Sequence, residues 1–296
     1  MKHIPVLMAE VIKFLQIKES MRVIDATCGA GGHSHEFVKL VGESGQVFAF
    51  EKDEKSFEAL LEYLPEAKLF NKSYTEMSVI PKPVDAILFD LGVSSMQLDE
   101  AERGFSFRKD GALDMRFSKK QTKTAAEIVN NYSFLDLRRI VKQYGEEKKA
   151  AKIARRICDA RAKQKISTTL ELEKIIYMPN YSDRKHPATR TFQALRIETN
   201  SELLTVERGI EIGIRMLKSG GRLGVISFHS LEDRVVKNKL KEFLGSCSCP
   251  KNLPICVCGK KAEIRVLTKK PIYPSSLEVK TNRRARSAIF RVIEKL

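Results

Sequence analysis

The sequence predicts an α/β protein with a doubly wound parallel sheet and an inserted small helical domain. Over the first 90 or so residues, short continuous apolar runs alternate with segments of helical spacing, which is typical of parallel strands covered on both faces. Between about residues 113 and 190 the strand signals stop and helical spacing takes over. Strand signals then resume. We therefore expect one discontinuous domain, 1–112 and 191–296, interrupted by a helical substrate-recognition domain, 113–190.

The first half of the chain supplies most of the expected sheet. A glycine cluster follows the first strand, Pro65 stops the second long helix, and Pro83 and Asp90 bound the most apolar strand. The expected strands are residues 22–26, 47–50, 68–71 and 84–89, and the expected helices are 11–16, 34–41 and 56–63.

In the expected insertion, capping residues mark the starts of helices. Ser133 precedes a helix whose apolar residues recur at helical spacing, and Gly145 stops it. A second helix covers 150–162, and Thr168 with Glu171 has the spacing of a capping box that opens a third. After the insertion we expect a helix at 203–217, a turn at Gly220 and Gly221, and strands at 223–228, 264–267 and 287–293.

Composition and charge narrow the class of protein. The 296 residues are 43% hydrophobic and 30% charged, which excludes a disordered chain. The net charge is +16, and it is concentrated: residues 138–165 hold 11 basic and 3 acidic residues, and residues 260–296 hold the same numbers, so each stretch carries +8. Such clusters favour a polyanionic partner, although solubility alone is the alternative.

The chain shows no sign of export or of a membrane span. Charged residues interrupt every apolar stretch near the N-terminus, and no apolar run reaches the roughly 20 residues that cross a bilayer. The six cysteines then predict free thiols in a reducing compartment. We expect a cytoplasmic protein.

A glycine loop, residues 25–33, follows the first expected strand. Glycines let the backbone approach a ligand at the start of a helix, although a tight turn alone would also use them. Ser34 stands where the dinucleotide fingerprint requires its third glycine, which opposes a nicotinamide cofactor. Asp25, before the glycines, suits a ligand with an ammonium and a sulfonium rather than a pyrophosphate.

Two further acids follow strands. Glu51 ends the second strand 20 residues after Gly31, about the spacing at which a carboxylate reaches ribose hydroxyls. Asp90 ends the strongest strand, so it is expected beside the reaction centre. Together with the loop, these acids favour an adenosine-type ligand. Cys28 lies near the same face and is expected to be a small packed side chain.

Long motifs in a fixed order make the chain resemble a known family. The motifs are residues 3–7, 25–33, 90–97 with Asp99, 103–107, 113–116, 144–147, 186–196, 227–234 and 284–288. They cover the chain nearly end to end and resemble the bacterial family of ribosomal small-subunit RNA methyltransferase H, also called MraW. In two places the chain departs from that family: Glu51 stands where Asp is usual, and Arg283 stands where Pro is usual.

The resemblance implies a class I (Rossmann-like) fold, S-adenosyl-L-methionine as cofactor, and N4 methylation of a cytidine in 16S rRNA. The expected partner is 16S rRNA within the small subunit or a late assembly precursor, without a membrane; a homodimer is compatible. The implied cofactor residues are Gly31, Gly32, His33, Glu51, Tyr74, Asp90 and Gln97.

Methylation of an amine requires correct alignment of the reacting atoms and does not require a covalent enzyme intermediate. The lone pair of the cytosine amine is delocalised into the ring, so the enzyme must align nitrogen, methyl and sulfur and accept a hydrogen bond from the amine. Asp90 or a carbonyl of residues 91–94 meets that need, and we take Asp90 and Ser94 as candidate catalytic residues. Methylation of a pyrimidine carbon would instead require a cysteine nucleophile.

The candidate RNA-binding residues are aromatic and basic. Phenylalanines can stack on a displaced base, and arginines can grip phosphates, although core packing and surface ion pairs are the alternatives. The candidates are Arg103, Phe105, Phe107, His186, Arg190, Arg196, His229, Arg234, Arg284 and Arg286.

Four cysteines, Cys247, Cys249, Cys256 and Cys258, form two close pairs. Their C-x-C spacing differs from the usual C-x-x-C zinc knuckle, so we expect no metal and a loop with free thiols, with a zinc site as the alternative. Three other functions remain open: a non-catalytic RNA-binding assembly factor, a nicotinamide-dependent oxidoreductase, and a methyltransferase that acts on protein or DNA.

Overall fold

A computed structural model of the chain describes residues 4–179, 186–245, 259 and 261–296. The chain divides into two compact units, residues 1–92 with 203–296 (unit 1) and residues 93–202 (unit 2). The insertion thus begins at Val93 and ends at Glu202, wider than the expected 113–190, because the segment after β4 already packs with the helices of unit 2. Cys247, Cys249, Cys256 and Cys258 lie outside the described residues.

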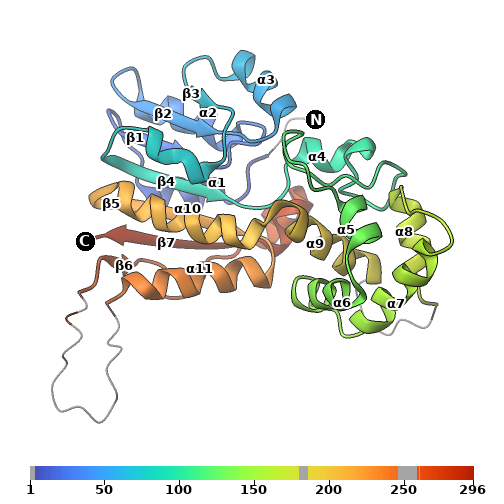
Figure 1. Cartoon of the computed structure of the whole chain (residues 1–296). Helices are drawn as coiled ribbons and strands as arrows, with labels where there is room; N and C mark the ends of the chain where they lie inside the picture. The colour runs from blue at the N-terminus through green and yellow to red at the C-terminus, as the bar shows by residue number, and fades with distance from the viewer. Residues whose placement is uncertain (1–3, 180–185, 246–258, 260) are drawn as a thin grey trace, which may run out of the picture. The chain divides into compact units, whose positions relative to one another are not determined.

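Unit 1 is built on a seven-stranded sheet (Figure 1). The strand order is β3-β2-β1-β4-β5-β7-β6; β1 to β5 are parallel, and β7 runs antiparallel to both β5 and β6. The strands are β1 (Arg22–Asp25), β2 (Gln46–Phe50), β3 (Lys68–Phe70), β4 (Val84–Asp90), β5 (Leu217–Ser227), β6 (Ile264–Val266) and β7 (Ile289–Lys295). The chain order reverses between β1 and β4, the place where doubly wound sheets bind ligands.

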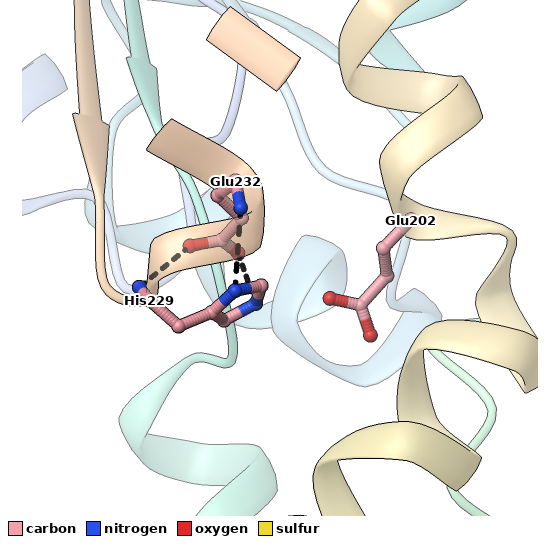
Figure 2. Close-up of side chains that lie close together, drawn as sticks. All are labelled: Glu202, His229 and Glu232. Carbon is pink, nitrogen blue, oxygen red and sulfur yellow. Dashed lines mark hydrogen bonds and ion pairs between the residues drawn. The ribbon is translucent and has the colours of Figure 1, made fainter. Parts of the chain in front are cut away.

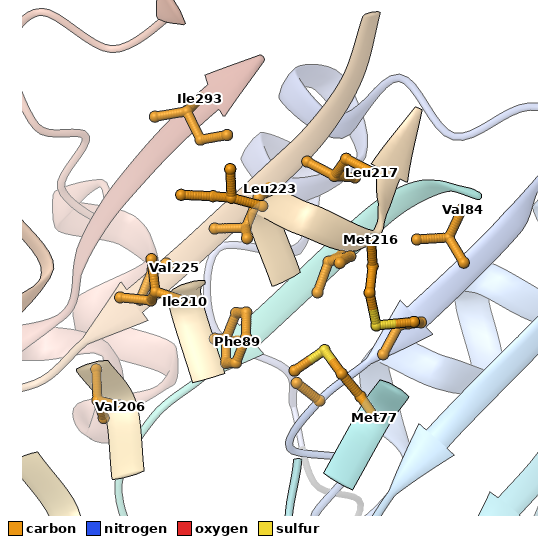
Figure 3. Close-up of a cluster of buried hydrophobic side chains, with 14 of the residues drawn as sticks. Met77, Val84, Phe89, Val206, Ile210, Met216, Leu217, Leu223, Val225 and Ile293 are labelled. Atoms are coloured by element: carbon orange, nitrogen blue, oxygen red, sulfur yellow. The ribbon is translucent and has the colours of Figure 1, made fainter. Parts of the chain in front are cut away.

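Helices cover both faces of this sheet, as the continuous apolar strands predict. The helices of unit 1 are α1 (Met8–Leu15), α2 (Gly32–Val41), α3 (Glu54–Tyr63), η1 (Tyr74–Val79), α10 (Glu202–Met216), α11 (Ser230–Phe243), α12 (Ser276–Thr281) and η3 (Arg283–Ser287). Successive residues of β4 point to opposite faces: Ile87 and Phe89 enter the core under α10 and α11, whereas Ala86 and Leu88 enter the core under α1 and α2. Figure 3 shows the first of these cores.

A glycine allows close contact in that core. A Cβ on Gly209 of α10 would lie 2.6 Å from the ring of Tyr74 and 3.1 Å from that of Phe89. The two rings meet edge to face, 5.3 Å between centroids. The ring of Tyr74, a predicted cofactor residue, is therefore fixed against α10 and β4.

One expected turn is wrong. Gly220 and Gly221 do not separate a helix from a strand, because β5 already begins at Leu217. Its pairing with β4 shifts from Val84↔Leu217 to Ala86↔Arg222, so residues 218–221 form an irregularity, and Gly220 has a φ of 76°. A bulge of this kind uses glycine for the same conformational reason as a turn.

Unit 2 is helical. Its elements are α4 (Ser95–Asp99), η2 (Ala101–Arg103), α5 (Ala125–Asn131), α6 (Phe134–Gln143), α7 (Ala150–Arg161), α8 (Thr169–Ile176) and α9 (Pro187–Asn200). The predicted cap at Ser133 and the capping box of Thr168 with Glu171 are both present. A further capping box, Thr124 with Glu127, opens α5. Within the described ranges no helix is long and apolar enough to cross a membrane.

Buried carboxylates at the carboxyl ends of the strands

Asp25 lies at the end of β1 and is 1% exposed. Its carboxylate accepts hydrogen bonds from the Ser34 hydroxyl (2.6 Å) and from the Thr27 N–H (3.2 Å). Burial raises the pKa of Asp25 to about 6, although the hydrogen bond from Ser34 works in the opposite direction. Asp25 thus links the glycine loop to the first turn of α2, and its buried negative charge remains unfavourable for the folded state.

The glycine loop is shaped by its neighbours. Gly31 has a φ of 81°, and a Cβ there would lie 2.8 Å from both Leu60 of α3 and Leu64, the residue that caps α3 at its C-terminus. Packing on α3, together with the positive φ, thus requires glycine at this position; the expected reason, close approach of a ligand, is not needed. Helix α2 begins at Gly32 without a side-chain cap from Gly31, and the N-terminus of a helix favours an anionic group.

Glu51, directly after β2, reaches this loop. One carboxylate oxygen accepts the N–H of Gly29 (2.9 Å), and the other accepts the N–H of Asp53 (2.7 Å). Burial raises its pKa to about 7, and these two backbone hydrogen bonds only partly offset that effect. Each oxygen has a second lone pair, so the carboxylate can still accept bonds from ligand hydroxyls. The glycine loop and the end of β2 are therefore directly joined.

Asp90 is the last residue of β4, which pairs with β1 on the side opposite β2. Its N–H donates to the Thr27 hydroxyl (2.6 Å), which links the ends of β1 and β4. Its Oδ1 is buried without a hydrogen-bond partner among the described residues. Burial raises the pKa of Asp90 well above its usual range, and the negative charges of Asp25 and Glu232 raise it further. This carboxylate lacks a donor or cation that a ligand can supply.

His33, in the first turn of α2, faces Asp90. Its Nε2 lies 3.0 Å from the Val6 carbonyl, which can only accept, so Nε2 carries a proton. Its Nδ1 lies 3.6 Å from Asp90 Oδ2, too far for a hydrogen bond but close enough for electrostatic interaction. His33 is thereby held in place beside the acid.

His229 begins α11 as a helix cap (Figure 2). Its Nδ1 accepts the N–H of Glu232 (3.3 Å), and the Glu232 carboxylate accepts the N–H groups of Phe228 (2.8 Å) and His229 (3.3 Å). This is a capping box with histidine in place of the usual Ser or Thr. His229 Nε2 lies 3.2 Å from Glu232 Oε1 but makes no aligned hydrogen bond. His229 therefore has a structural role that sequence reasoning missed.

Three more predicted RNA residues belong to unit 1. Arg234 is exposed in the first turns of α11, and Arg284 and Arg286 are exposed in η3. Asn282 caps η3 by accepting the N–H of Arg284 (3.2 Å). These positions leave the arginine side chains accessible to a large polyanion.

The predicted residues Ser94 and Gln97 belong to unit 2 and bind each other. The N–H of Ser94 donates to Gln97 Oε1 (3.0 Å), and the N–H of Gln97 donates to Ser94 Oγ (3.3 Å). Gln97 is buried. This reciprocal pair fixes the start of α4.

Several predicted RNA-binding residues of unit 2 have packing, hydrogen-bond or ion-pair partners within that unit. Arg103 donates to the carbonyls of Arg116 (2.9 Å) and Phe117 (3.3 Å). Phe105 is 8% exposed and stacks on Phe117 with 5.8 Å between centroids. Arg196 makes two hydrogen bonds to the Glu202 carboxylate, at 2.8 and 2.9 Å.

The predicted RNA-binding residues Arg190, Phe107 and His186 have other partners in unit 2. Arg190 donates to the Glu146 carbonyl (3.3 Å). The ring of His186 stacks between Phe107 and Tyr177, with centroid separations of 5.4 and 5.8 Å. Its Nε2 lies 3.3 Å from Glu173. Because Tyr177 is about half exposed (47%), this stack reaches the surface of unit 2.

Sequence reasoning named Asp25 as suited to a ligand with an ammonium and a sulfonium, but it gave Thr27 and Ser34 no role in the site. The hydrogen bonds of these three residues connect β1, β4 and α2. Thr27 and Ser34 take part through tertiary contacts that no local pattern contains.

The strand order, the antiparallel β7 and the acids at the strand ends define a class I (Rossmann-like) S-adenosylmethionine-dependent methyltransferase sheet. This confirms the expected fold class. The family model described as "MraW methylase family" matches residues 1–296, and the chain belongs to that family.

Relatives extend over the whole chain. The ribosomal RNA small subunit methyltransferase H of Caldicellulosiruptor saccharolyticus is 45% identical over 305 residues, which cover 100% of this chain and 99% of the relative. The protein of the same name from Carboxydothermus hydrogenoformans is 46% identical over 306 residues, covering 99% and 98%. A solved structure of an rRNA methylase from Streptococcus thermophilus has a TM-score of 0.45 at 12% identity, covering 100% of this chain and 99% of that one.

Proposed function

We propose that this protein uses S-adenosyl-L-methionine to methylate the N4 amine of a cytidine in the 16S rRNA of the small ribosomal subunit. The observation that carries the proposal is the group of acids at the strand ends of unit 1: Asp25, Glu51 and Asp90 have raised pKa values, and Asp90 Oδ1 has no partner among the described residues. The family and the names of the full-length relatives support methylation of small-subunit rRNA.

The residues present fit this cofactor. The sulfonium and the ammonium of the cofactor can act as cationic partners of these carboxylates. Its ribose hydroxyls can donate hydrogen bonds to the remaining lone pairs of Glu51. The N-terminus of α2, at Gly32 and His33, suits a carboxylate. The proposed set of cofactor residues also includes Gly31, Tyr74 and Gln97. Gly31 shapes the glycine loop, the ring of Tyr74 packs against Phe89 of β4, and Gln97 fixes the start of α4.

The cofactor supplies an electrophilic methyl group when bound. The protein must orient the cytosine amine, exclude water and accept a hydrogen bond from the amine as its nitrogen gains the methyl and loses a proton. Asp90 is the proposed acceptor because its Oδ1 is buried and unpartnered and its raised pKa suits it to take a proton. Ser94 and the carbonyls of residues 91–94 are the other proposed contacts.

The RNA side of the proposal rests on exposed residues. Arg234, Arg284 and Arg286 are proposed phosphate contacts on unit 1. The Phe107–His186–Tyr177 stack is a proposed surface for a base on unit 2, the proposed substrate-recognition unit. We expect Arg103, Phe105, Arg190, Arg196 and His229 to influence RNA binding indirectly, because each has a structural partner.

Methyl transfer to defined small subunits tests the function. Small subunits from cells that lack the enzyme should accept labelled methyl groups from S-adenosylmethionine, and digestion followed by mass spectrometry should find N4-methylcytidine at a single position. Subunits from cells that contain the enzyme, already modified, should accept almost none. Methylation at a carbon or a ring nitrogen, or none in either preparation, would refute the proposal.

A further inference from the structure

The exposed sides of α6 and α7 carry much of the first basic cluster, and no residue of the proposed site lies among them. The two helices pack against each other within unit 2 (Figure 1). We define the α6–α7 basic face as five exposed residues: Arg138, Lys142, Lys148, Lys152 and Arg155.

The apolar spacing of α6 directs its basic residues outward. Leu137, Ile140 and Val141 are fully buried in the core of unit 2. Arg138 and Lys142, four residues apart, lie on the opposite, exposed side about one turn from each other. The stripe on α6 therefore follows directly from its amphipathic pattern.

Helix α7 has the same organisation. Ile153, Ala154 and Ile157 are buried, whereas Lys152 and Arg155 are exposed, and Lys148 is exposed just before the helix. The guanidinium of Arg155 lies over the ring of Phe134, 4.7 Å from its centroid, at the start of α6. Stacking holds the guanidinium plane in place and leaves its N–H groups available to an acceptor.

The charges of this face are not neutralised by the protein. Within the described ranges, none of the five residues forms an ion pair. Two exposed acids lie on the same helices: Asp136, which lies 3.9 Å from Arg139, and Asp159, four residues after Arg155. Other arginines of α7 are used differently: Arg156 donates to the Ile175 carbonyl and Arg161 to the carbonyls of Val129 and Tyr132. The helix thus has structural arginines on one side and uncompensated cations on the other.

We infer that the α6–α7 basic face binds the phosphate backbone of RNA outside the nucleotide that reacts. Closely spaced cations without counter-charges gain most from a polyanion, because each phosphate contact releases condensed counterions. RNA as the occupant rests on the proposed function. A membrane surface fits less well, because Leu135 (67% exposed) is the one large apolar side chain that the described part of the two helices exposes, and membrane-surface helices need a wide apolar face.

Binding of RNA without a methyl donor tests this inference independently of catalysis. The full-length variant R138Q/K142Q/K152Q and the unaltered protein are titrated with 16S rRNA over a range of salt concentrations. The variant should bind at least tenfold more weakly at about 0.1 M salt, and its slope of log affinity against log salt should be flatter by about 2 to 3, from three lost phosphate contacts.

Two matched variants control for total charge and for folding. K18Q/K82Q/K241Q removes three exposed lysines from unit 1 and should leave the salt slope close to that of the unaltered protein. R138K/K142R/K152R keeps the charges of the face and should bind RNA like the unaltered protein. Circular dichroism verifies that all three variants fold.

The inference is overturned if R138Q/K142Q/K152Q and K18Q/K82Q/K241Q bind RNA equally well, or if the unaltered protein does not bind RNA. It is also overturned if the face variant loses binding to vesicles of anionic phospholipid while its RNA binding is unchanged. Because the assay contains no methyl donor, RNA binding through this face would stand even if the methylation test failed.

Discussion

Buried and partly buried acids have different partners in the two units. Among the described residues at the strand ends of unit 1, Asp25 and Glu51 accept bonds from neutral groups and Asp90 lies near His33. The pKa values of all three acids are raised. In unit 2, Asp114 and Glu202 are each held by an arginine, Arg116 and Arg196, with N–O distances of 2.8 Å. For Asp114, burial opposes ionisation, but the hydrogen bonds from Arg116 outweigh it and lower the pKa.

We interpret the difference as one between acids that stabilise the fold and acids that, under the proposed function, bind a ligand. A buried carboxylate with an arginine has its charge compensated by the chain, so it needs nothing further. One without a cation destabilises the ligand-free fold, and such acids gather where a ligand will compensate them. Asp233 supports this distinction within unit 1: it lies on α11 rather than at a strand end, and Arg291 compensates it at 2.6 Å.

The sharpest test of this comparison is Asp90→Asn. We expect methyl transfer to fall by about 10²–10³-fold, because the proposed acceptor of the amine hydrogen bond loses its charge. The free energy of unfolding should not decrease, because the substitution removes a buried charge that no cation compensates. Single-turnover kinetics and urea unfolding measure the two quantities.

Asp90→Ala is the control for packing, since it also removes the side chain from the end of β4. If Asp90→Asn destabilised the protein as strongly as it slowed the reaction, Asp90 would be a structural acid and the comparison would be wrong.

The opposite result is expected for Arg196→Met in unit 2. The substitution keeps most of the aliphatic stem but leaves the Glu202 carboxylate without its guanidinium, which should cost about 3 kcal/mol of unfolding free energy. Urea unfolding measures the loss, and RNA affinity measured where the variant is folded should change little. A stable variant that bound RNA much more weakly would instead make Arg196 a direct RNA contact.

The sequence predicted the positions of the strand-end acids well. Each apolar strand ends where a polar residue follows, and parallel strands bring those ends to one edge, so Glu51 and Asp90 could be assigned without coordinates. The helices capped by Ser133 and Thr168 were also predicted, whereas those capped by Thr124 and Ser275 were not. A histidine cap, as at His229, offers no such local signal, and α11 was accordingly not predicted.

Side-chain partners across the fold could not be predicted. Gly31 is required by Leu60 and Leu64, some thirty residues away in the sequence. Glu202 reaches Arg196 because Ser201, with a φ of 51°, turns the chain between α9 and α10. Propensity and periodicity describe one element at a time, so they cannot show whether an arginine faces RNA or an internal acid.

The smallest expected effect is a dependence of cofactor affinity on pH. In the ligand-free fold the pKa of Asp25 is about 6 and that of Glu51 about 7, above their usual 3.8 and 4.5. Between about pH 4 and 7 the fold therefore holds protons that the unfolded chain has released, so these two groups make it less stable as pH rises. A cationic ligand favours the ionised acids, so its binding should release protons and tighten with rising pH.

We expect affinity for S-adenosylmethionine to increase by up to about tenfold per pH unit for each proton released, and to level off above about pH 8. Calorimetry in buffers of different ionisation enthalpy measures both the affinity and the protons. Glu51→Gln should remove the upper part of the dependence, near pH 7, and leave the part that belongs to Asp25. An affinity that stayed constant from pH 5.5 to 8 would mean that the ligand does not compensate these charges, and the acids of unit 1 would then need a structural explanation like those of unit 2.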